Sequence, residues 1–196
     1  CDESKNNVIS LFNAVGLIPN ANVVGATHFD GIDIKKVRDI YKTENNYEHK
    51  YALILINSET SGNDSQLIKD TISHALKYKN THDFIILDGN GDSSTVPIKL
   101  RSELITLREK EQYCVSVFGN PDHEHFISLM MNCDKFITNS SCVTYEAPFL
   151  MNESDIIKIG NRNINRTAVP RTSHSGKASE KTACLIKEYL THKRYQ

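Results

Sequence analysis

The sequence has 196 residues and a formal net charge of −1, with 39% hydrophobic and 24% charged residues. This length and composition are ordinary for a globular protein of one domain with a substantial core. No segment concentrates Lys and Arg, so charge gives no support for nucleic acid or an anionic membrane as a partner. The longest apolar runs have five or six residues, too few to span a membrane, and the first residues lack the pattern of a secretory signal.

Five cysteines are scattered along the chain without any C-x-x-C pair. An odd, scattered set favours a reduced, cytoplasmic protein over a disulfide scaffold. The chain begins at Cys1 rather than Met, which we interpret as an indication that it is a piece of a longer protein.

Two apolar periods alternate along the chain: short unbroken runs typical of strands, and spacings of three and four residues typical of helices. In chain order they predict a strand at 22–25, a helix at 33–41, a strand at 51–56, a helix at 63–76 including its cap, strands at 84–87 and 113–118, a helix from Pro121 to Met130, a strand at 135–137, a short helix at 140–147, a strand at 155–159 and a closing helix at 176–192.

Strands without polar alternation, interleaved with amphipathic helices, indicate a parallel sheet covered on both faces. The predicted fold class is therefore α/β, a Rossmann-like doubly wound parallel sheet. Such sheets bind ligands at the carboxyl ends of their strands. The loops of interest follow Ile56, Leu87, Phe118, Ile137 and Ile159.

The loop after Ile137 carries hydroxyls at Ser140 and Ser141, and a carboxylate follows at Glu146. Backbone N–H groups at the start of a helix suit a phosphate, and serine hydroxyls add donors. An ionised carboxylate only accepts hydrogen bonds, so the vicinal hydroxyls of a ribose are a natural partner. The alternative is that one serine is a simple N-cap and Glu146 is solvated.

The loops after the second and last predicted strands also carry polar residues. Residues 88–94 begin like a calcium loop but lack the Gly and the Glu that such a loop requires, so they predict either a turn or a loop that approaches a ligand. Gly160 permits close backbone approach, and Arg162 and Arg166 either meet phosphate or are solvated.

Metal and nucleophile sites are not predicted. His123 and His125 lie two residues apart in an expected helix and so do not share a face. Neither a G-x-S-x-G elbow nor a Cys paired with a His is present in the sequence.

The order of these loops carries a family resemblance. TNSSCVTYEAP followed by IKIGNRNINR resembles the G-N-S-S-x-G-x-x-E-A-P and V-N-I-G-x-R-Q-x-G-R segments of the hydrolysing UDP-N-acetylglucosamine 2-epimerases. Residues 89–94 loosely match the P-N-x-D-x-G-S loop of that family. The resemblance covers most of residues 20–175 and is dense between 126 and 166.

The resemblance implies the C-terminal half of a two-domain type B glycosyltransferase/epimerase fold. Residues 1–20 would be a linker or N-terminal extension, 21–175 a Rossmann-like UDP-binding domain and 176–196 a closing C-terminal helix. The implied partners are UDP or UDP-GlcNAc, a missing N-terminal Rossmann-like domain and a second copy in a homo-oligomer.

The implied reaction converts UDP-GlcNAc to ManNAc and UDP in amino-sugar or sialic-acid biosynthesis, without a cofactor or metal. This chain would hold the UDP part. The residues implied to bind UDP are Ser140 and Ser141 at the diphosphate, Glu146 at the ribose, Asn90 near the phosphates or uridine, and Arg162 and Arg166 at the site or its surroundings.

The sequence departs from the family pattern at several positions. Asn57 stands where the family has a histidine, and an amide neither carries charge nor moves a proton near neutral pH. Val143, Asn163 and Asn165 replace a Gly, a Gln and a Gly. In the family, the ligand lies in a cleft between two domains, and catalysis needs both of them. We therefore expect the isolated chain to be inactive. The alternatives are a non-catalytic UDP-binding module and a structural domain without ligand.

Overall fold

A computed structural model describes residues 2–18, 21–40, 49–59, 64–88, 95–108, 114–164, 166 and 176–193. The chain divides into two compact units, residues 33–168 and residues 1–32 with 169–196. The boundaries expected at residues 20 and 175 stay a prediction. Among the described residues, no helix has the length and apolarity needed to cross a membrane.

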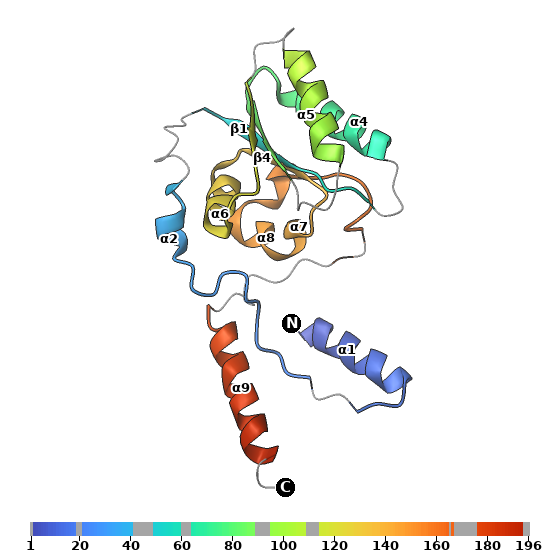
Figure 1. Ribbon diagram of the computed structural model, residues 1–196, viewed down its shortest axis with the longest axis vertical. Helices are drawn as coiled ribbons and strands as arrows, with labels where there is room; N and C mark the ends of the chain where they lie inside the picture. The colour runs from blue at the N-terminus through green and yellow to red at the C-terminus, as the bar shows by residue number, and fades with distance from the viewer. Residues whose placement is uncertain are drawn as a thin grey trace. The chain divides into compact units, whose positions relative to one another are not determined.

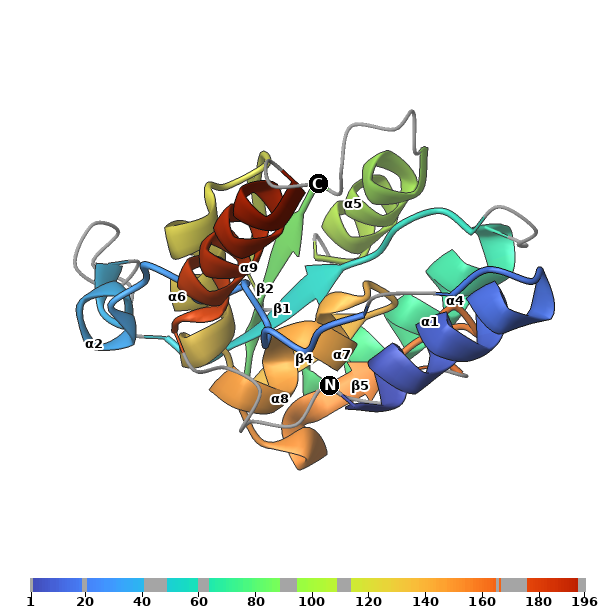
Figure 2. The same ribbon diagram turned by 90° about the horizontal axis from the view of Figure 1, so that it is seen from below.

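The larger unit is built on a five-stranded sheet in which every pair of neighbouring strands is parallel (Figures 1 and 2). The strands are β1 (Tyr51–Leu55), β2 (Asp83–Leu87), β3 (Val115–Phe118), β4 (Lys135–Thr138) and β5 (Ile156–Lys158), in the spatial order β3-β2-β1-β4-β5. The predicted fold class, a Rossmann-like α/β sheet, is confirmed.

Helices cover both faces of this sheet (Figure 1). One face packs against α4 (Asp64–Ala75) and α5 (Thr95–Arg108), and the other against α6 (His123–Asn132), α7 (Cys142–Tyr145) and α8 (Ala147–Leu150). Short helical turns complete the unit: α2 (Ile34–Val37), η1 (Leu76–Tyr78) and η2 (Glu153–Asp155).

Alternate residues of β1 face the two cores. Ala52 and Ile54 pack with α4 and α5, whereas Tyr51 and Leu53 pack with α6 and its neighbours, and all four are at most 2% exposed. Because both faces are buried, every position of the strand must be apolar. This explains the unbroken runs in the sequence.

The smaller unit contains α1 (Asp2–Ala14) and α9 (Ala178–Lys193). The backbone N–H of Ser179, at the start of α9, donates to Oδ2 of Asp30 at 2.6 Å. Such a contact satisfies one of the donors that a helix leaves open at its first turn. The closing helix predicted at 176–192 is confirmed.

The strand predicted at residues 22–25 is wrong: residues 21–27 have no regular secondary structure. This segment belongs to the smaller unit, and Val23 is 44% exposed, so the apolar pair Val23-Val24 is not paired in the sheet. The helix predicted at 33–41 is shorter, since α2 ends at Val37, and Tyr41 lies outside the described residues. Helices α1 and α5 were not predicted.

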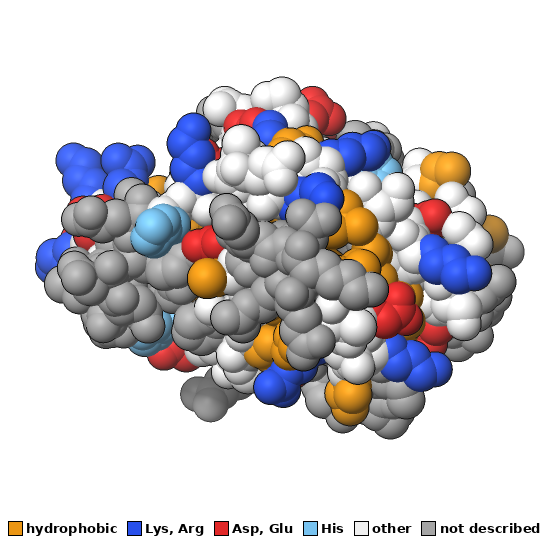
Figure 3. All heavy atoms as spheres, turned by 90° about the horizontal axis from the view of Figure 1, so that it is seen from above, with side chains coloured by type: hydrophobic (Ala, Val, Ile, Leu, Met, Phe, Trp, Pro, Cys, Tyr) orange, Lys and Arg blue, Asp and Glu red, His pale blue; other side chains and the backbone are white. Residues whose placement is uncertain are grey.

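Charges on the face shown in Figure 3 are mixed, with Lys and Arg side chains interspersed with Asp and Glu. This arrangement agrees with the even distribution of charge along the sequence.

Candidate functional site

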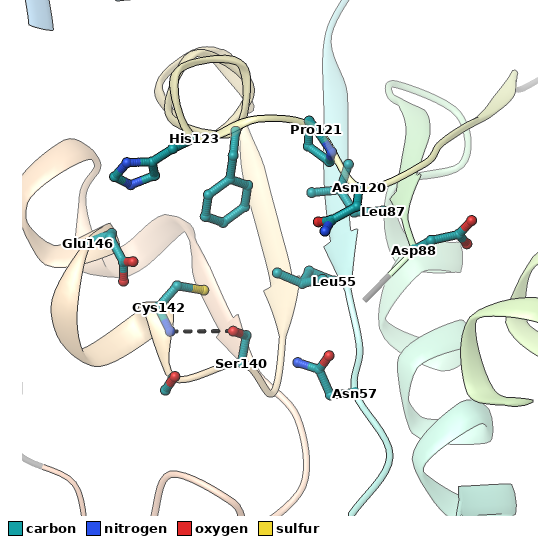
Figure 4. Close-up of a pocket in the computed structure, with 12 residues that line it drawn as sticks. Leu55, Asn57, Leu87, Asp88, Asn120, Pro121, His123, Ser140, Cys142 and Glu146 are labelled. Atoms are coloured by element: carbon teal, nitrogen blue, oxygen red, sulfur yellow. Dashed lines mark hydrogen bonds between the residues drawn. The ribbon is translucent and has the colours of Figure 1, made fainter. Parts of the chain in front are cut away.

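A pocket of about 340 Å³ lies at the carboxyl edge of the sheet, beyond the ends of β1, β2, β3 and β4 (Figure 4). Its size is within the roughly 300–1,000 Å³ of small-molecule sites. The polar residues lining it are Asn57, Asp88, Asn120, His123, Ser140, Ser141 and Glu146.

The structure brings four of the predicted site residues to this pocket: Asn57, Ser140, Ser141 and Glu146. Asn90 lies outside the described residues. Arg162 and Arg166 are exposed and are not among the residues lining the pocket. Their roles toward a ligand stay predictions.

Residues 139–141 connect β4 to α7 and are called the serine loop below. This loop is shaped by Thr138, the last residue of β4. The fully buried Thr138 donates its hydroxyl to the carbonyl of Leu55 at 2.6 Å and accepts the N–H of Ser140 at 2.9 Å. The chain therefore turns immediately after the strand, and Ser140 and Ser141 come to the pocket wall.

Helix capping accounts for little of this loop. Ser141 is the N-cap residue of α7 but makes no capping hydrogen bond with its side chain. The hydroxyl of Ser140 accepts the N–H of Cys142 at 3.4 Å, a long contact (Figure 4). Because α7 has four residues, its dipole adds less than a long helix would. The hydroxyls of Ser140 and Ser141 are therefore among the donors that this loop presents to the pocket.

Two asparagines that were not predicted as site residues support the loop. The side chain of Asn139 accepts the N–H of Asn57 at 2.8 Å and donates to its carbonyl at 2.7 Å. Asn163 donates from Nδ2 to the carbonyls of Asn139 and Ser140, at 2.8 and 3.0 Å. The loops after β1, β4 and β5 are therefore joined by side-chain amides.

Glu146 lies at the junction of α7 and α8, and Figure 4 shows its carboxylate on the same side of the pocket as His123. Cys142 lies beside it and is 4% exposed. Burial raises the pKa of the Cys142 thiol to about 12, so this thiol is protonated near neutral pH and is not a nucleophile.

The described lining carries two carboxylates, Asp88 and Glu146, and one histidine, His123, but neither Lys nor Arg. An anion held by these residues therefore relies on hydrogen-bond donors rather than on a fixed cation. The apolar lining includes Leu55, Leu87 and the half-buried ring of Phe126, which offers a surface for a planar base.

Asn120 and His123 were not predicted as site residues. Both lie after β3, in or next to the loop that follows Phe118, so the strand-end rule applied to that loop finds them. The neighbouring His125 has a local role. Its backbone N–H and its ring nitrogen contact the Asp122 carboxylate at 2.9 and 2.8 Å, and these bonds lower the pKa of Asp122.

Gly160, at the end of β5, has a φ of 67°. A Cβ at this position would collide with the carboxylate of Glu59 from the loop after β1. Glycine is favoured here by the positive φ rather than by this contact, because the Glu59 carboxylate is the end of a flexible side chain that can move away.

The chain is similar to known proteins both in sequence and in structure. No protein-family model matches the sequence. The polysialic acid biosynthesis protein P7 of Escherichia coli is 25% identical over 169 residues, covering 84% of this chain and 41% of that protein. A UDP-GlcNAc 2-epimerase from Neisseria meningitidis, solved bound to UDP-GlcNAc, aligns with 95% of this chain and 60% of its own at a TM-score of 0.61 and 16% identity. MnaA of S. aureus, solved with UDP, aligns with 95% of this chain and 58% of its own at a TM-score of 0.63 and 15% identity.

The chain has the fold of the UDP-GlcNAc 2-epimerases. The resemblance to these epimerases predicted from the serine and arginine motifs is confirmed. The chain spans 58–60% of the length of the two solved epimerases and 41% of the length of the E. coli protein.

Proposed function

We propose that this chain is the nucleotide-holding part of a hydrolysing UDP-GlcNAc 2-epimerase, which converts UDP-GlcNAc to ManNAc and UDP. In this proposal the chain corresponds to the C-terminal domain and binds the UDP moiety, and the rest of the enzyme supplies the groups that act on the sugar. The expected ligands are UDP and UDP-GlcNAc.

The observation that carries the proposal is the convergence of Asn57, Ser140, Ser141 and Glu146 on one pocket at the carboxyl edge of the sheet. These residues come from the ends of β1 and β4, and the serine loop carries the family motif. Structures with this fold have been solved with UDP and with UDP-GlcNAc, which supports a nucleotide sugar as the ligand.

The division of labour within the pocket follows from its chemistry. The hydroxyls of Ser140 and Ser141 donate to the diphosphate, and the carboxylate of Glu146 accepts hydrogen bonds from the ribose hydroxyls. Phe126 gives the uracil an aromatic surface. Because the described lining lacks Lys and Arg, the isolated chain binds UDP weakly.

A second function is favoured by Asn57. This residue lines the pocket where the family pattern has a histidine, and its amide does not transfer a proton near neutral pH. The alternative is therefore a non-catalytic module that binds UDP or a UDP-sugar. Release of UDP from UDP-GlcNAc by a longer protein that contains this chain supports the epimerase, whereas binding without UDP release supports the module.

The nucleotide site is tested by titrating the purified chain with UDP, UMP and ADP in a calorimeter. We expect UDP to bind with a Kd in the millimolar range or below. It should bind more tightly than UMP because of its second phosphate, and more tightly than ADP because of its base. Absence of UDP binding at millimolar concentration contradicts a nucleotide site in this chain.

A further inference from the structure

Two asparagines outside the pocket connect three loops that follow neighbouring strands. Neither Asn139 nor Asn163 is among the residues lining the pocket, yet their amides hold the backbone of Asn57 and Ser140, which do line it. Because β4 lies between β1 and β5, these hydrogen bonds connect the loops that follow three consecutive strands of the sheet.

Asn139 uses both the oxygen and the nitrogen of its side-chain amide in hydrogen bonds. Its side chain makes one accepting and one donating bond to the same residue, Asn57, in the manner of a pair in a β-ladder. Asn139 is fully buried, so a substitution leaves buried backbone groups without partners. This residue is thus tied to the fold as well as to the site.

Asn163 acts on the other side of the serine loop. Its single Nδ2 group donates to two successive carbonyls, those of Asn139 and Ser140, which belong to the peptide bonds on either side of Ser140. Fixing both carbonyls sets the orientation of these two peptide planes, and therefore the direction of the Ser140 and Ser141 side chains. The Oδ1 atom of Asn163 accepts a hydrogen bond from Nη1 of Arg166, at a distance of 3.4 Å.

We propose that Asn163 is a positioning residue for the nucleotide site, acting from the loop after β5 on the serine loop after β4. The inference rests on the proposed nucleotide-binding function. Asn163 does not touch the ligand; it determines the affinity by holding the two serine hydroxyls in the geometry that a diphosphate requires.

The chain contains a matched control for this role. Asn132, at the end of α6, also donates from Nδ2 to two backbone carbonyls, those of Arg38 and Ser128, at 2.5 and 2.9 Å. It is half-buried like Asn163 and is not among the residues lining the pocket. Asn132→Ala and Asn163→Ala therefore each remove two hydrogen bonds from Nδ2 to backbone carbonyls, at different places, and Asn163→Ala also removes the long contact with Arg166.

The test measures the UDP affinity of the wild-type chain, Asn163→Ala and Asn132→Ala by NMR titration, well below their unfolding temperatures. We expect Asn163→Ala to weaken UDP binding by about 3- to 30-fold, the equivalent of one or two hydrogen bonds, and Asn132→Ala to change it by less than about twofold. In the free protein, the backbone amide signals of Ser140 and Ser141 should shift in Asn163→Ala and stay in place in Asn132→Ala.

A further variant guards against a loss of folding. Asn163→Gln keeps both N–H donors on a longer side chain, and we expect it to fold and to retain more affinity than Asn163→Ala. If the wild type binds UDP and the Asn163 variants bind it with the same affinity, the positioning role is overturned and the proposed function stands. The same conclusion follows if Asn132→Ala loses as much UDP affinity as Asn163→Ala. Absence of UDP binding in the wild type overturns the proposed function and the positioning role together.

Discussion

The two edges of the sheet each carry a hollow, and the two hollows differ in charge. At the carboxyl edge, the described lining of the pocket has serine hydroxyls, amides and two carboxylates. At the amino edge, a smaller hollow of about 190 Å³ lies before β1 and β2. Its charged lining is two lysines, Lys50 and Lys79, and one carboxylate, Asp83, and the rest of the lining is His49, Asn80, Thr81 and His82. By charge alone, an anion would choose the amino edge.

The difference shows that net charge and a built site are separate properties. Lysines on the surface are long and strongly hydrated, so a cluster of them holds an anion without fixed geometry. The carboxyl-edge pocket instead holds its donors on a loop fixed by Thr138, Asn139 and Asn163. Preorganised donors give a ligand a defined position, which is why we assign the nucleotide to the carboxyl edge.

The largest expected difference between the edges is in thiol reactivity. Cys142 lies in the pocket wall with a pKa raised to about 12 by burial, whereas Cys114 is exposed at the amino edge, just before β3. Because the thiolate is the reactive form, iodoacetamide at pH 8 should alkylate Cys114 at least about 100-fold faster than Cys142.

Peptide mass spectrometry over a time course measures both rates. In denaturant the two thiols should react at similar rates, which serves as the control. Equal rates in the folded protein would mean that the pocket wall is open to solvent at Cys142, contrary to the structure.

Substitution of donors at each edge is the next comparison. Replacing both hydroxyls, Ser140→Ala with Ser141→Ala, should weaken UDP binding by about 1–3 kcal/mol, or roughly 5- to 150-fold, because hydrogen bonds to a charged group are lost. Replacing two lysines of the other hollow, Lys50→Ala with Lys79→Ala, should change the affinity by less than about twofold at 0.15 M salt, because charges at the opposite edge of the sheet are screened from the pocket.

Calorimetry on the two double variants and the wild type gives these values. A greater loss of affinity in the lysine variant than in the serine variant would move the nucleotide to the amino edge.

The smallest expected effect concerns an ion pair at the amino end of β4. Nζ of Lys135 lies 2.6 Å from Oδ1 of Asp155, next to the start of β5. The hydrogen bond between them lowers the pKa of Asp155 and raises the pKa of Lys135. The pair thus stabilises the fold above the ordinary pKa of an aspartate, and this contribution is lost as the pH falls through the lowered pKa of Asp155.

Asp155→Asn should therefore reduce the free energy of unfolding by up to about 1 kcal/mol at pH 7. The difference from the wild type should shrink in acid, where Asp155 is protonated, and also in alkali, as the pH rises through the raised pKa of Lys135. Urea unfolding at a series of pH values measures it. A difference that is the same at every pH would mean that the substitution acts through packing and not through charge.

The fold was predictable because its signal is local. Residues 51–56 and 84–87 are unbroken apolar runs between helical patterns, and such runs have few stable arrangements other than a parallel sheet with two covered faces. The strand predicted at 22–25 failed for the complementary reason. A short apolar pair satisfies the local pattern without a neighbour in the sheet, and the pairing partner is not contained in the local sequence.

The candidate site was predictable where a residue stands two residues after the end of a strand, as Asn57 and Ser140 do. Asn139 and Asn163 were not found, because their roles depend on β4 lying between β1 and β5. Strand order is a property of the whole chain, so the amides that link neighbouring loops become visible only in three dimensions. For Arg162 and Arg166, the sequence did not decide between solvent exposure and contact with a ligand. In the structure both residues are exposed and neither lines the pocket.

The central claim, that the nucleotide binds at the carboxyl edge, is tested most directly by following the backbone amide signals of the whole chain during a UDP titration. We predict saturable shifts at Asn57 and from Ser140 to Glu146, with signals from Lys79 to Asp83 unchanged. Saturable shifts at residues 79–83, with those of the serine loop unchanged, would contradict it.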